Sequence, residues 1–352
     1  MSDLILKGAK ESKQTVGKDS QNSNGTIDPH INFDLLLKFY YFNVYHQRSI
    51  RLKAALLSQY TNSDLDKFIP DNEIANYFLY ALTMDMEIYG NAFLEQAGTK
   101  SDFYLYHVLG FQGRVNKNKE IYQIPENNED PVKLDGFHFK YHSPSSKYYG
   151  EPDYLTTLEQ INTTKQADQY NSSFFKNGAR PGFGIVFENS SPNQEQVNSF
   201  KQFFGSNFKG YSNAHKSLVL HTGKTSDGAN PAKVRLEKLS GVEDMSFEKL
   251  KNVTRDEIIA AHGVPPRLVG VMSAGGLGGG RELIDQLHAF NEVTIKPKTK
   301  VIKDSFAHIG INHEPELIDV TNFKDDSDLI SNLVDRDILT NIEAKEILGF
   351  NK

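Results

Sequence analysis

The chain has 352 residues, no cysteine and a formal net charge of −6 at pH 7. The lack of cysteine excludes disulfides, thiolate zinc sites and cysteine nucleophiles, and no apolar run approaches the roughly 18–20 residues that a membrane span requires. The acidic balance argues against a protein that grips nucleic acid through a broad basic face, whereas 38% hydrophobic and 11% aromatic residues argue against global disorder.

The first part of the chain is predicted to be a disordered arm followed by a mixed region of helices and strands. Residues 1–31 are rich in Lys, Ser, Asn, Gln and Gly and have little to bury beyond Leu4–Leu6. Apolar residues near helical spacing predict a helix over 33–57 and a second over 74–89, which Gly90 ends. Short strands are expected at "NAFLEQ" (91–96), "FYLYHVL" (103–109), "EIYQI" (120–124) and "FHFKYH" (137–142).

The middle of the chain is predicted to hold a long helix and a small α/β unit. Nothing breaks a helix from Pro152 to Asn177, and its thin apolar stripe indicates packing against neighbours in a bundle or ring. Residues 182–241 are expected to form the small unit, with a strand over 182–187, a capped helix after it, and strands at "SLVLHT" (217–222) and "VRLEKLS" (234–240).

The helix of this small unit is rich in aromatic residues: Phe200, Phe203, Phe204 and Phe208. A unit of ~60 residues does not easily bury so much aromatic surface, which favours contacts with a neighbour or partner. A closed aromatic core within the unit is the alternative.

The last part of the chain returns to longer helices. A helix over 242–262 is predicted to end at "GVPPRLVG" (263–270), since neither proline tolerates continuation. A helical pattern covers 281–309, with a kink expected at Pro297. "HEPELIDVT" (313–321) is predicted as a final strand and 340–349 as a final helix with Glu343 in its capping box.

A glycine-rich segment, "SAGGLGGGREL" (273–283), precedes the helical pattern over 281–309. Glycine-rich turns that open helices often hold phosphates, but this one lacks the P-loop Lys-Ser/Thr pair and does not follow a clean strand of a βαβ unit. An ordinary surface loop and a mobile loop that slides against a partner are the alternatives. The residues concerned are Met272, Ser273, Ala274, Gly275, Gly276, Leu277, Gly278, Gly279, Gly280 and Arg281.

The sequence offers no convincing catalytic or metal centre, so neither an enzyme nor a cofactor is expected. His138 and His142 are four apart but lie in a strand pattern, where this spacing does not bring two ligands together. No G-x-S-x-G elbow and no H-E-x-x-H helix occurs. The acidic residues 325–328 are typical of a solvated turn.

Six stretches in this order resemble tailed-phage portal proteins, specifically the PBSX type, from about Phe33 to Gly349. They are "NVYHQRSIRLKA" (43–54), "YGNAFLE" (89–95), "YYGEPDYL" (148–155), "FFKNGARPG" (174–182), "KNVTRDEIIAAHGVPPRLVG" (251–270) and "LTNIEAKEILG" (339–349). None is a catalytic signature; their joint order carries the resemblance.

The resemblance implies an α+β portal fold with a wing, a two-helix stem, a small α/β clip and a kinked tunnel helix, assembled as a ring. Mapped onto this chain, the parts are the arm 1–31, wing 32–151, stem helix 152–181, clip 182–241, second stem helix 242–263, tunnel loop region 264–281, and tunnel helix, wing return and short C-terminal helix 282–352. The chain ends soon after Gly349, so no extended helical crown is expected.

The resemblance also implies a function in the virions of tailed phages and prophages. A ring of twelve at one capsid vertex would form the DNA channel for packaging by terminase, head-tail joining and DNA exit, after assembly in the host bacterial cytoplasm. The implied partners are the terminase large subunit, the major capsid protein and scaffold, a head-completion adaptor, and double-stranded DNA passing non-specifically; a membrane is not among them. There are two competing hypotheses. The chain could be another structural capsid or tail protein, or a phosphate-binding enzyme that uses the glycine-rich segment.

Overall fold

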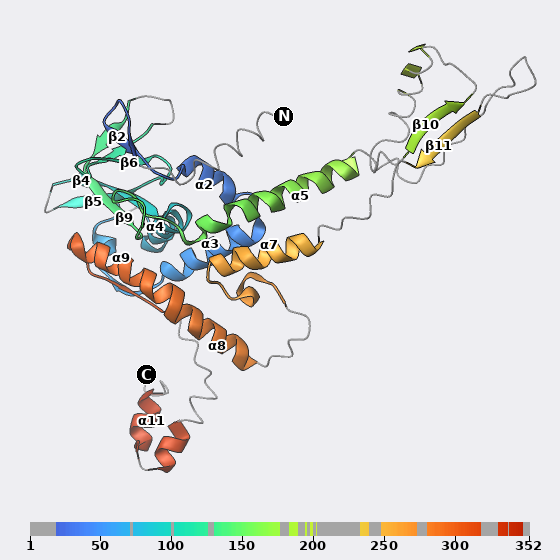
Figure 1. Cartoon of the computed structure of the whole chain (residues 1–352). Helices are drawn as coiled ribbons and strands as arrows, with labels where there is room; N and C mark the ends of the chain where they lie inside the picture. Colours follow the sequence, from blue (N-terminus) through green and yellow to red (C-terminus); the bar gives the residue numbers. More distant parts are fainter. Residues whose placement is uncertain are drawn as a thin grey trace, which may run out of the picture. The chain divides into compact units, whose positions relative to one another are not determined.

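The structure is a computed structural model (Figure 1). It describes residues 19–70, 73–99, 102–125, 130–176, 183–188, 194–195, 198–199, 202, 233–238, 248–272, 280–317, 330–336 and 338–347. The chain divides into two units, of which the first comprises Met1–Ile161 with Arg255–Lys352 and the second Asn162–Thr254.

The described N-terminal residues form structure that the sequence did not predict. β1 (Ser20–Gln21) and β2 (Thr26–Asp28) pair as antiparallel strands around a turn in which Gly25 has φ +86°. Ile27 and Ile31 are buried. The prediction of disorder over 1–31 is therefore wrong for residues 19–31, because buried isoleucines and the pairing of β2 with β6 hold this segment on the core. Residues 1–18 lie outside the described residues.

Two helices replace the single helix predicted over 33–57. α2 (Phe33–Tyr40) and α3 (Val44–Leu57) are separated at Asn43, whose extended backbone and side-chain oxygen cap α3. That oxygen accepts hydrogen bonds from the N–H groups of Tyr45 (2.9 Å) and His46 (3.0 Å). An asparagine that satisfies two otherwise unpaired donors favours a new helix start over continuation.

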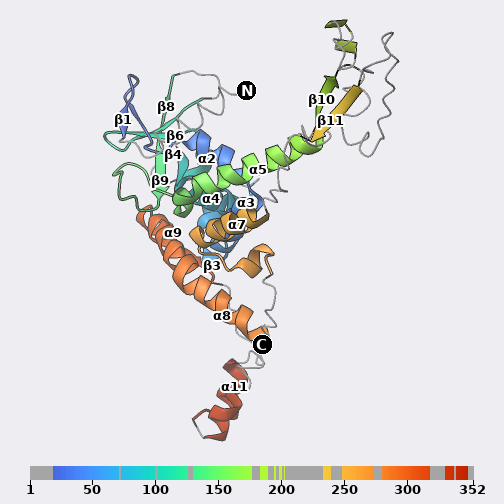
Figure 2. The same cartoon turned by 45° about the vertical axis from the view of Figure 1, so that its right-hand side comes forward.

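α4 and four of the strands after it agree with the sequence prediction, whereas the strands at 113–116 and 132–134 were not predicted. α4 (Ala75–Tyr89) ends at Gly90, which has φ +70°. β4 (Asn91–Gly98) lies between β5 (Phe103–Val108) and β9 (Gly136–Lys140) in an antiparallel sheet of order β5-β4-β9. A second sheet has the order β1-β2-β6-β7-β8, with β6 (Gly113–Asn116), β7 (Ile121–Gln123) and β8 (Val132–Leu134) (Figure 2).

Two hydrophobic clusters lie on opposite faces of the three-stranded sheet, because successive strand side chains point to opposite sides. Leu94 and Phe139 belong to one cluster, which α9 joins through Phe306. Phe93 belongs to the other, with the inward residues of α2 and of the five-stranded sheet. These two clusters hold the helices of the first unit on the sheet.

The helical part of the chain after residue 247 begins in the second unit, which ends at Thr254, and continues in the first unit (Figures 1 and 2). α7 (Glu248–Ala261) leads to a 3-10 turn, η4 (Pro266–Val269). α8 (Gly280–Phe290), a π-helical turn, η5 (Asn291–Ile295), and α9 (Lys296–His308) form an uninterrupted helical run. β12 (His313–Pro315) pairs with β3 (Tyr60–Ser63), which the 3-10 turn η1 (Leu65–Lys67) follows.

α11 (Asn341–Ile347) confirms the predicted final helix and its capping box. The Glu343 carboxylate accepts a hydrogen bond from the Thr340 N–H (2.8 Å), and the Thr340 hydroxyl accepts one from the Glu343 N–H (3.3 Å). Of the strand predicted over 313–321, the described part is a strand only at His313–Pro315.

The helix predicted from Pro152 begins differently from its prediction. Asp153–Thr157 form a 3-10 turn, η2, and the α-helix α5 runs from Leu158 to Lys176. In the second unit α5 and α7 are neighbours, because Thr164 and Thr254 share a hydrogen bond of 3.2 Å and Lys251 pairs with Asp168. β10 (Phe183–Glu188) and β11 (Lys233–Lys238) pair as antiparallel strands at two predicted positions.

Candidate functional site: the frame of the glycine-rich segment

The predicted site residues fall largely outside the described part of the chain. Residues 273–279 of the glycine-rich segment lie outside it, as do Phe200, Phe203, Phe204 and Phe208. The structure describes Met272, which is 90% exposed. Gly280 and Arg281 form the start of α8, and the Arg281 side chain is not described.

The two ends of the glycine-rich segment are joined by an ion pair. Before the segment, Val269 and Val271 are buried in the first hydrophobic cluster. Arg267 of η4 and Glu282 of α8 approach to 3.5 Å between Nη2 and Oε2. Both side chains are partly exposed, so the pair itself adds little stability. It nevertheless brings the last turn before the segment close to the first turn after it.

The first turn of α8 argues against a phosphate site. Glu282 lies in that turn and its carboxylate accepts a hydrogen bond from Gln286 (3.2 Å). A helix N-terminus attracts negative charge, and here the chain's own carboxylate supplies it. A bound phosphate would face this carboxylate at short range.

The helical run after the segment contains a π turn directly before Pro297. The Lys296 N–H bonds to the Asn291 carbonyl, five residues back, and Pro297 lies in the first turn of α9. Proline has no N–H and its ring clashes with the carbonyl four residues earlier. A widened turn at this place accommodates both defects. The kink predicted at Pro297 thus coincides with a change of helix type.

The end of α7 packs tightly against this π turn. Gly263 has φ +65°, and a Cβ atom there would lie 2.8 Å from the Thr294 hydroxyl oxygen. Only glycine combines that backbone conformation with so close an approach. The chain therefore meets the π turn immediately before "VPPRLVG" leads to the glycine-rich segment.

The first unit also contains a buried cluster of ion pairs, to which α9 contributes one residue. Lys298 of α9 pairs with Glu87 of α4 (2.7 Å) and with Asp153 of η2 (2.6 Å). Lys53 of α3 pairs with the same two carboxylates, at 2.9 Å from Asp153. The Tyr141 hydroxyl donates a hydrogen bond to Glu87 (2.8 Å). Two lysines and two carboxylates thus connect four helical elements with no net charge.

Charges within the cluster keep Lys53, Glu87 and Asp153 ionised. Burial alone would raise the pKa of Glu87, but the charges of Lys298 and Lys53 hold that pKa below its ordinary value. Burial would likewise raise the pKa of Asp153, but the charges of Lys53 and Lys298 hold that pKa below its ordinary value. Burial would lower the pKa of Lys53, yet Glu87 and Asp153 raise it. Burial, helped by the charge of Lys53, lowers the pKa of Lys298, although Glu87 and Asp153 oppose this. Lys53, Glu87 and Asp153 are consequently charged at neutral pH.

A histidine pair adjoins the cluster. His46 Nδ1 of α3 and His262 Nε2, one residue after α7, are 2.9 Å apart, and both rings contact Tyr154. Burial, helped by the charge of Lys53, lowers the pKa of His46 to about 3. Burial also lowers the pKa of His262 well below its ordinary value. Both rings are neutral near pH 7, and one donates its N–H to the other.

The ion cluster and the histidine pair connect helices of the first unit. The residues that the structure describes contain no group of three or more His, Asp or Glu that could hold a metal ion. No helix within the described ranges is long and apolar enough to cross a membrane. The sequence prediction missed Lys53, Glu87, Asp153 and Lys298. One signal in the sequence could have revealed them. Helical spacing places Lys53 and Glu87 on the same helix faces as buried apolar residues.

The described residues thus contain helix-covered sheets, the neighbouring helices α5 and α7 with the antiparallel pair β10–β11 in the sequence between them, and an internal polar cluster. The model of the family described as "Phage portal protein" matches residues 71–349. The chain belongs to the phage portal protein family.

The chain is also similar to individual relatives and to a solved structure. The chain is 24% identical over 256 residues to the probable portal protein of Escherichia phage P2, which covers 70% of each chain. It is 25% identical over 224 residues to a protein of Rickettsia bellii and spans about half of that protein, 55% of its length. A chain in the virion of a gene transfer agent particle has the same fold, with a TM-score of 0.65, 18% identity, and coverage of 95% of this chain and 96% of that one.

Proposed function

We propose that this chain is the subunit of a ring of twelve at one capsid vertex, which forms the channel for DNA entry and exit. The family match over residues 71–349 carries the proposal. The fold likeness to a chain in the neck of a gene transfer agent particle computed with C12 symmetry supports the ring, with coverage of 96% of both chains. A ring requires each subunit to present two different faces to its neighbours.

The parts of the portal are assigned along the chain as follows. Residues 32–151 and 282–352 form the wing, with α8 and α9 as the tunnel helix. α5 and α7 form the stem, which their contacts at Thr164–Thr254 and Lys251–Asp168 support. The unit over 182–241 forms the clip, and the β10–β11 pair supports a compact unit there.

The glycine-rich segment is assigned to the channel wall, facing DNA. Twelve chains of −6 carry a formal charge of −72, and small side chains offer phosphates little to bind. A channel that translocates a polyanion must avoid tight phosphate contacts, since each would oppose movement. Arg281 is the single basic residue of the segment and the candidate electrostatic contact.

The partners follow from the same assignment. The clip, with its four phenylalanines, docks the terminase large subunit and later the head-completion adaptor, while the wing contacts the major capsid protein and scaffold. The chain performs no catalysis of its own, and the terminase supplies ATP hydrolysis. The assembled ring belongs to the virion after formation in the host bacterial cytoplasm.

Mass photometry and negative-stain microscopy of the purified chain test the proposal. We expect rings with a central hole and a mass near ~0.5 MDa, for twelve chains of 39.7 kDa. Rings that differ by one subunit agree with the proposal. A monomer across micromolar concentrations, or ATP turnover that substitution of Arg281 abolishes, would overturn it.

A further inference from the structure

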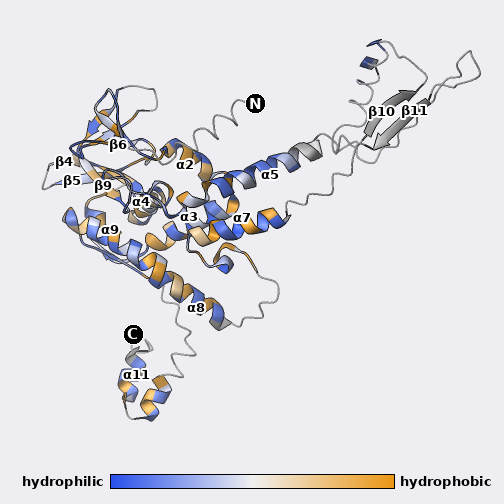
Figure 3. Ribbon diagram, viewed as in Figure 1, coloured by the Kyte–Doolittle hydropathy of each residue, from blue (hydrophilic) through white to orange (hydrophobic). Residues whose placement is uncertain are grey.

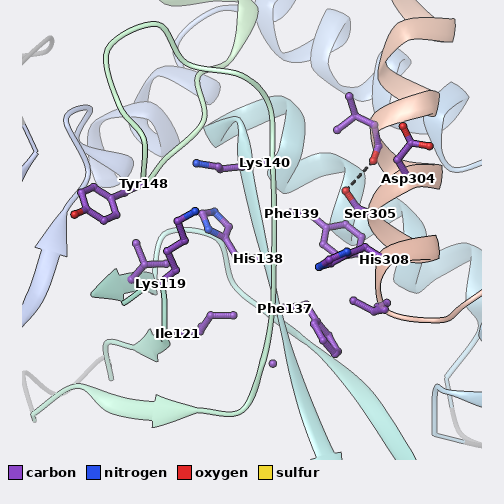
Figure 4. Close-up of a pocket in the computed structure, with 14 residues that line it drawn as sticks. Lys119, Ile121, Phe137, His138, Phe139, Lys140, Tyr148, Asp304, Ser305 and His308 are labelled. Atoms are coloured by element: carbon purple, nitrogen blue, oxygen red, sulfur yellow. Dashed lines mark hydrogen bonds between the residues drawn. The ribbon is translucent and has the colours of Figure 1, made fainter. Parts of the chain in front are cut away.

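A groove lies along the outer edge of β9 in the first unit. It has a volume of about 640 Å³. Figure 4 shows Lys119, Ile121 and Tyr148 on one side of the strand and Asp304 and His308 of α9 on the other. The groove is thus centred on a strand edge.

The β9 edge that faces the groove has unpaired backbone groups. The N–H of Tyr141 bonds to the Gly90 carbonyl (2.9 Å) and the N–H of Gln96 to the Asp135 carbonyl (2.7 Å). In an antiparallel pair every second residue bonds to the partner strand, so 135, 137, 139 and 141 face β4. Gly136, His138 and Lys140 consequently point their N–H and C=O groups away from β4. In the described part of the chain no strand pairs with this edge.

The side chains around this edge suit a strand with apolar residues on one face and an acidic residue on the other. Val301 of α9 and Ile309, the residue that follows α9, provide an apolar wall beside Phe137. Lys119 and Lys140 lie on the opposite side, where burial and the charge of Lys119 lower the pKa of Lys140. The Lys140 ammonium donates a hydrogen bond to the Lys147 carbonyl (2.7 Å), and the Asp19 charge opposes the lowering of its pKa. The two lysines still favour an acidic group on the strand that fills this side.

The N-terminal residues of the same chain begin beside the groove. Asp19 lines an adjoining pocket that shares Lys140 and Tyr148 with it, and its carboxylate accepts a hydrogen bond from the Ser146 hydroxyl (2.8 Å). The only apolar run before Asp19 is Leu4–Leu6, which Asp3 precedes. The 12 residues between Leu6 and Asp19 span up to roughly 40 Å when extended, which is ample for a return to the groove.

We propose that residues 3–7 of the chain add to the free edge of β9 as a further antiparallel strand of the same subunit. Leu4 and Leu6 would pack on the wall of Val301 and Ile309. Asp3, Ile5 and Lys7 share the alternate face. In the antiparallel direction Asp3 would lie at the Lys140 end and Ile5 beside Ile121, while Lys7 would lie at the Gly136 end, away from Lys140. The added strand covers an edge that would otherwise be open to pairing with other chains. This proposal does not depend on the proposed portal function.

Hydrogen exchange at single-residue resolution tests the pairing on the full chain. If residues 3–7 pair with β9, they bond to the N–H groups of His138 and Lys140, which point away from β4. These two amides should exchange at least tenfold more slowly in the native sequence than in the variant Leu4→Asp/Leu6→Asp. The amides of Phe137 and Phe139, bonded to β4, serve as the internal reference. The matched control Thr15→Asp/Val16→Asp changes the charge of the arm equally and should leave all four amides unchanged.

Two outcomes would overturn the proposal. One is equally fast exchange of the His138 and Lys140 amides in the native chain and in the Leu4→Asp/Leu6→Asp variant. The other comes from cross-linking the variant Leu6→Cys/Ile309→Cys with a short bismaleimide, which is specific because the chain has no cysteine of its own. We expect a bridge within one chain on a denaturing gel, whereas bridged dimers would assign the strand to a neighbouring copy.

Discussion

At the scale of single residues, the buried charges are the most consequential groups in the first unit. Lys53 is fully buried and contacts two carboxylates. Ion pairs of this kind add little net stability compared with apolar residues of similar size. Removal of one partner, however, leaves a buried charge without compensation.

Replacement of Lys53 by methionine should therefore lower the free energy of unfolding by about 3–5 kcal/mol. Chemical denaturation of the isolated chain measures the change. Lys67→Met, which removes an exposed partner of Asp64, is the control and should cost less than about 1 kcal/mol. A loss for Lys53→Met as small as that of the control would show that the cluster is open to water.

The histidine pair predicts loss of stability in mild acid. His46 has a pKa of about 3 in the folded chain and about 6.5 when unfolded. The unfolded state therefore binds more protons below pH 6.5, and stability falls as the pH drops through this window toward 3. Through His46 alone, the free energy of unfolding should fall by about 2 kcal/mol between pH 7 and pH 5.

Denaturation midpoints of the native chain and of His46→Leu, measured from pH 7 to pH 5, test this dependence. The variant should lose less stability over the window, because it has no proton to take up at this position. Parallel curves for the two chains would contradict the assignment of a neutral, buried His46.

At the scale of elements, helix ends and irregular turns define the frame of the glycine-rich segment. Gly263→Ala places a Cβ atom near the Thr294 hydroxyl in a backbone conformation that alanine disfavours. The expected cost is about 1–3 kcal/mol. Thr294→Ala in the same chain should recover only the steric part; full recovery would mean that the backbone conformation costs nothing.

The glycine-rich segment itself is expected to matter for DNA and not for assembly. Alanine at Gly275, Gly276 and Gly278–Gly280 restricts the backbone, so subunits follow a helical DNA less readily. Ring formation, observed by microscopy, should persist, while packaging in a phage complementation assay should fall. Normal packaging would assign these glycines to a simple surface turn.

At the scale of the whole molecule, function depends on contacts between subunits and with other proteins. The four phenylalanines of the clip are the sequence candidates for these contacts, and they stay a prediction because they lie outside the described residues. Phe203→Asp should weaken ring assembly or terminase docking. Mass photometry and a pull-down with the terminase measure the two effects, and an unchanged result in both would favour an aromatic core within one clip.

Most individual elements could be predicted from local patterns. α4 with its terminal Gly90, the strands at 91–98 and 136–140, and the capping box at Thr340–Glu343 depend on residues close together in the chain. The family resemblance followed from the order of six short stretches. Local hydrogen bonds, chain breakers and hydrophobic spacing act over a few residues, so one sequence suffices to recognise them.

Contacts between distant segments decided the rest. The segment 19–31 is ordered because Ile27 and Ile31 join a core built from residues far along the chain. Lys53, Glu87, Asp153 and Lys298 meet although as many as 245 positions separate them, and His46 meets His262 across 216. No local pattern encodes such pairs, because a buried charge is tolerable only where the fold brings its counter-charge within reach.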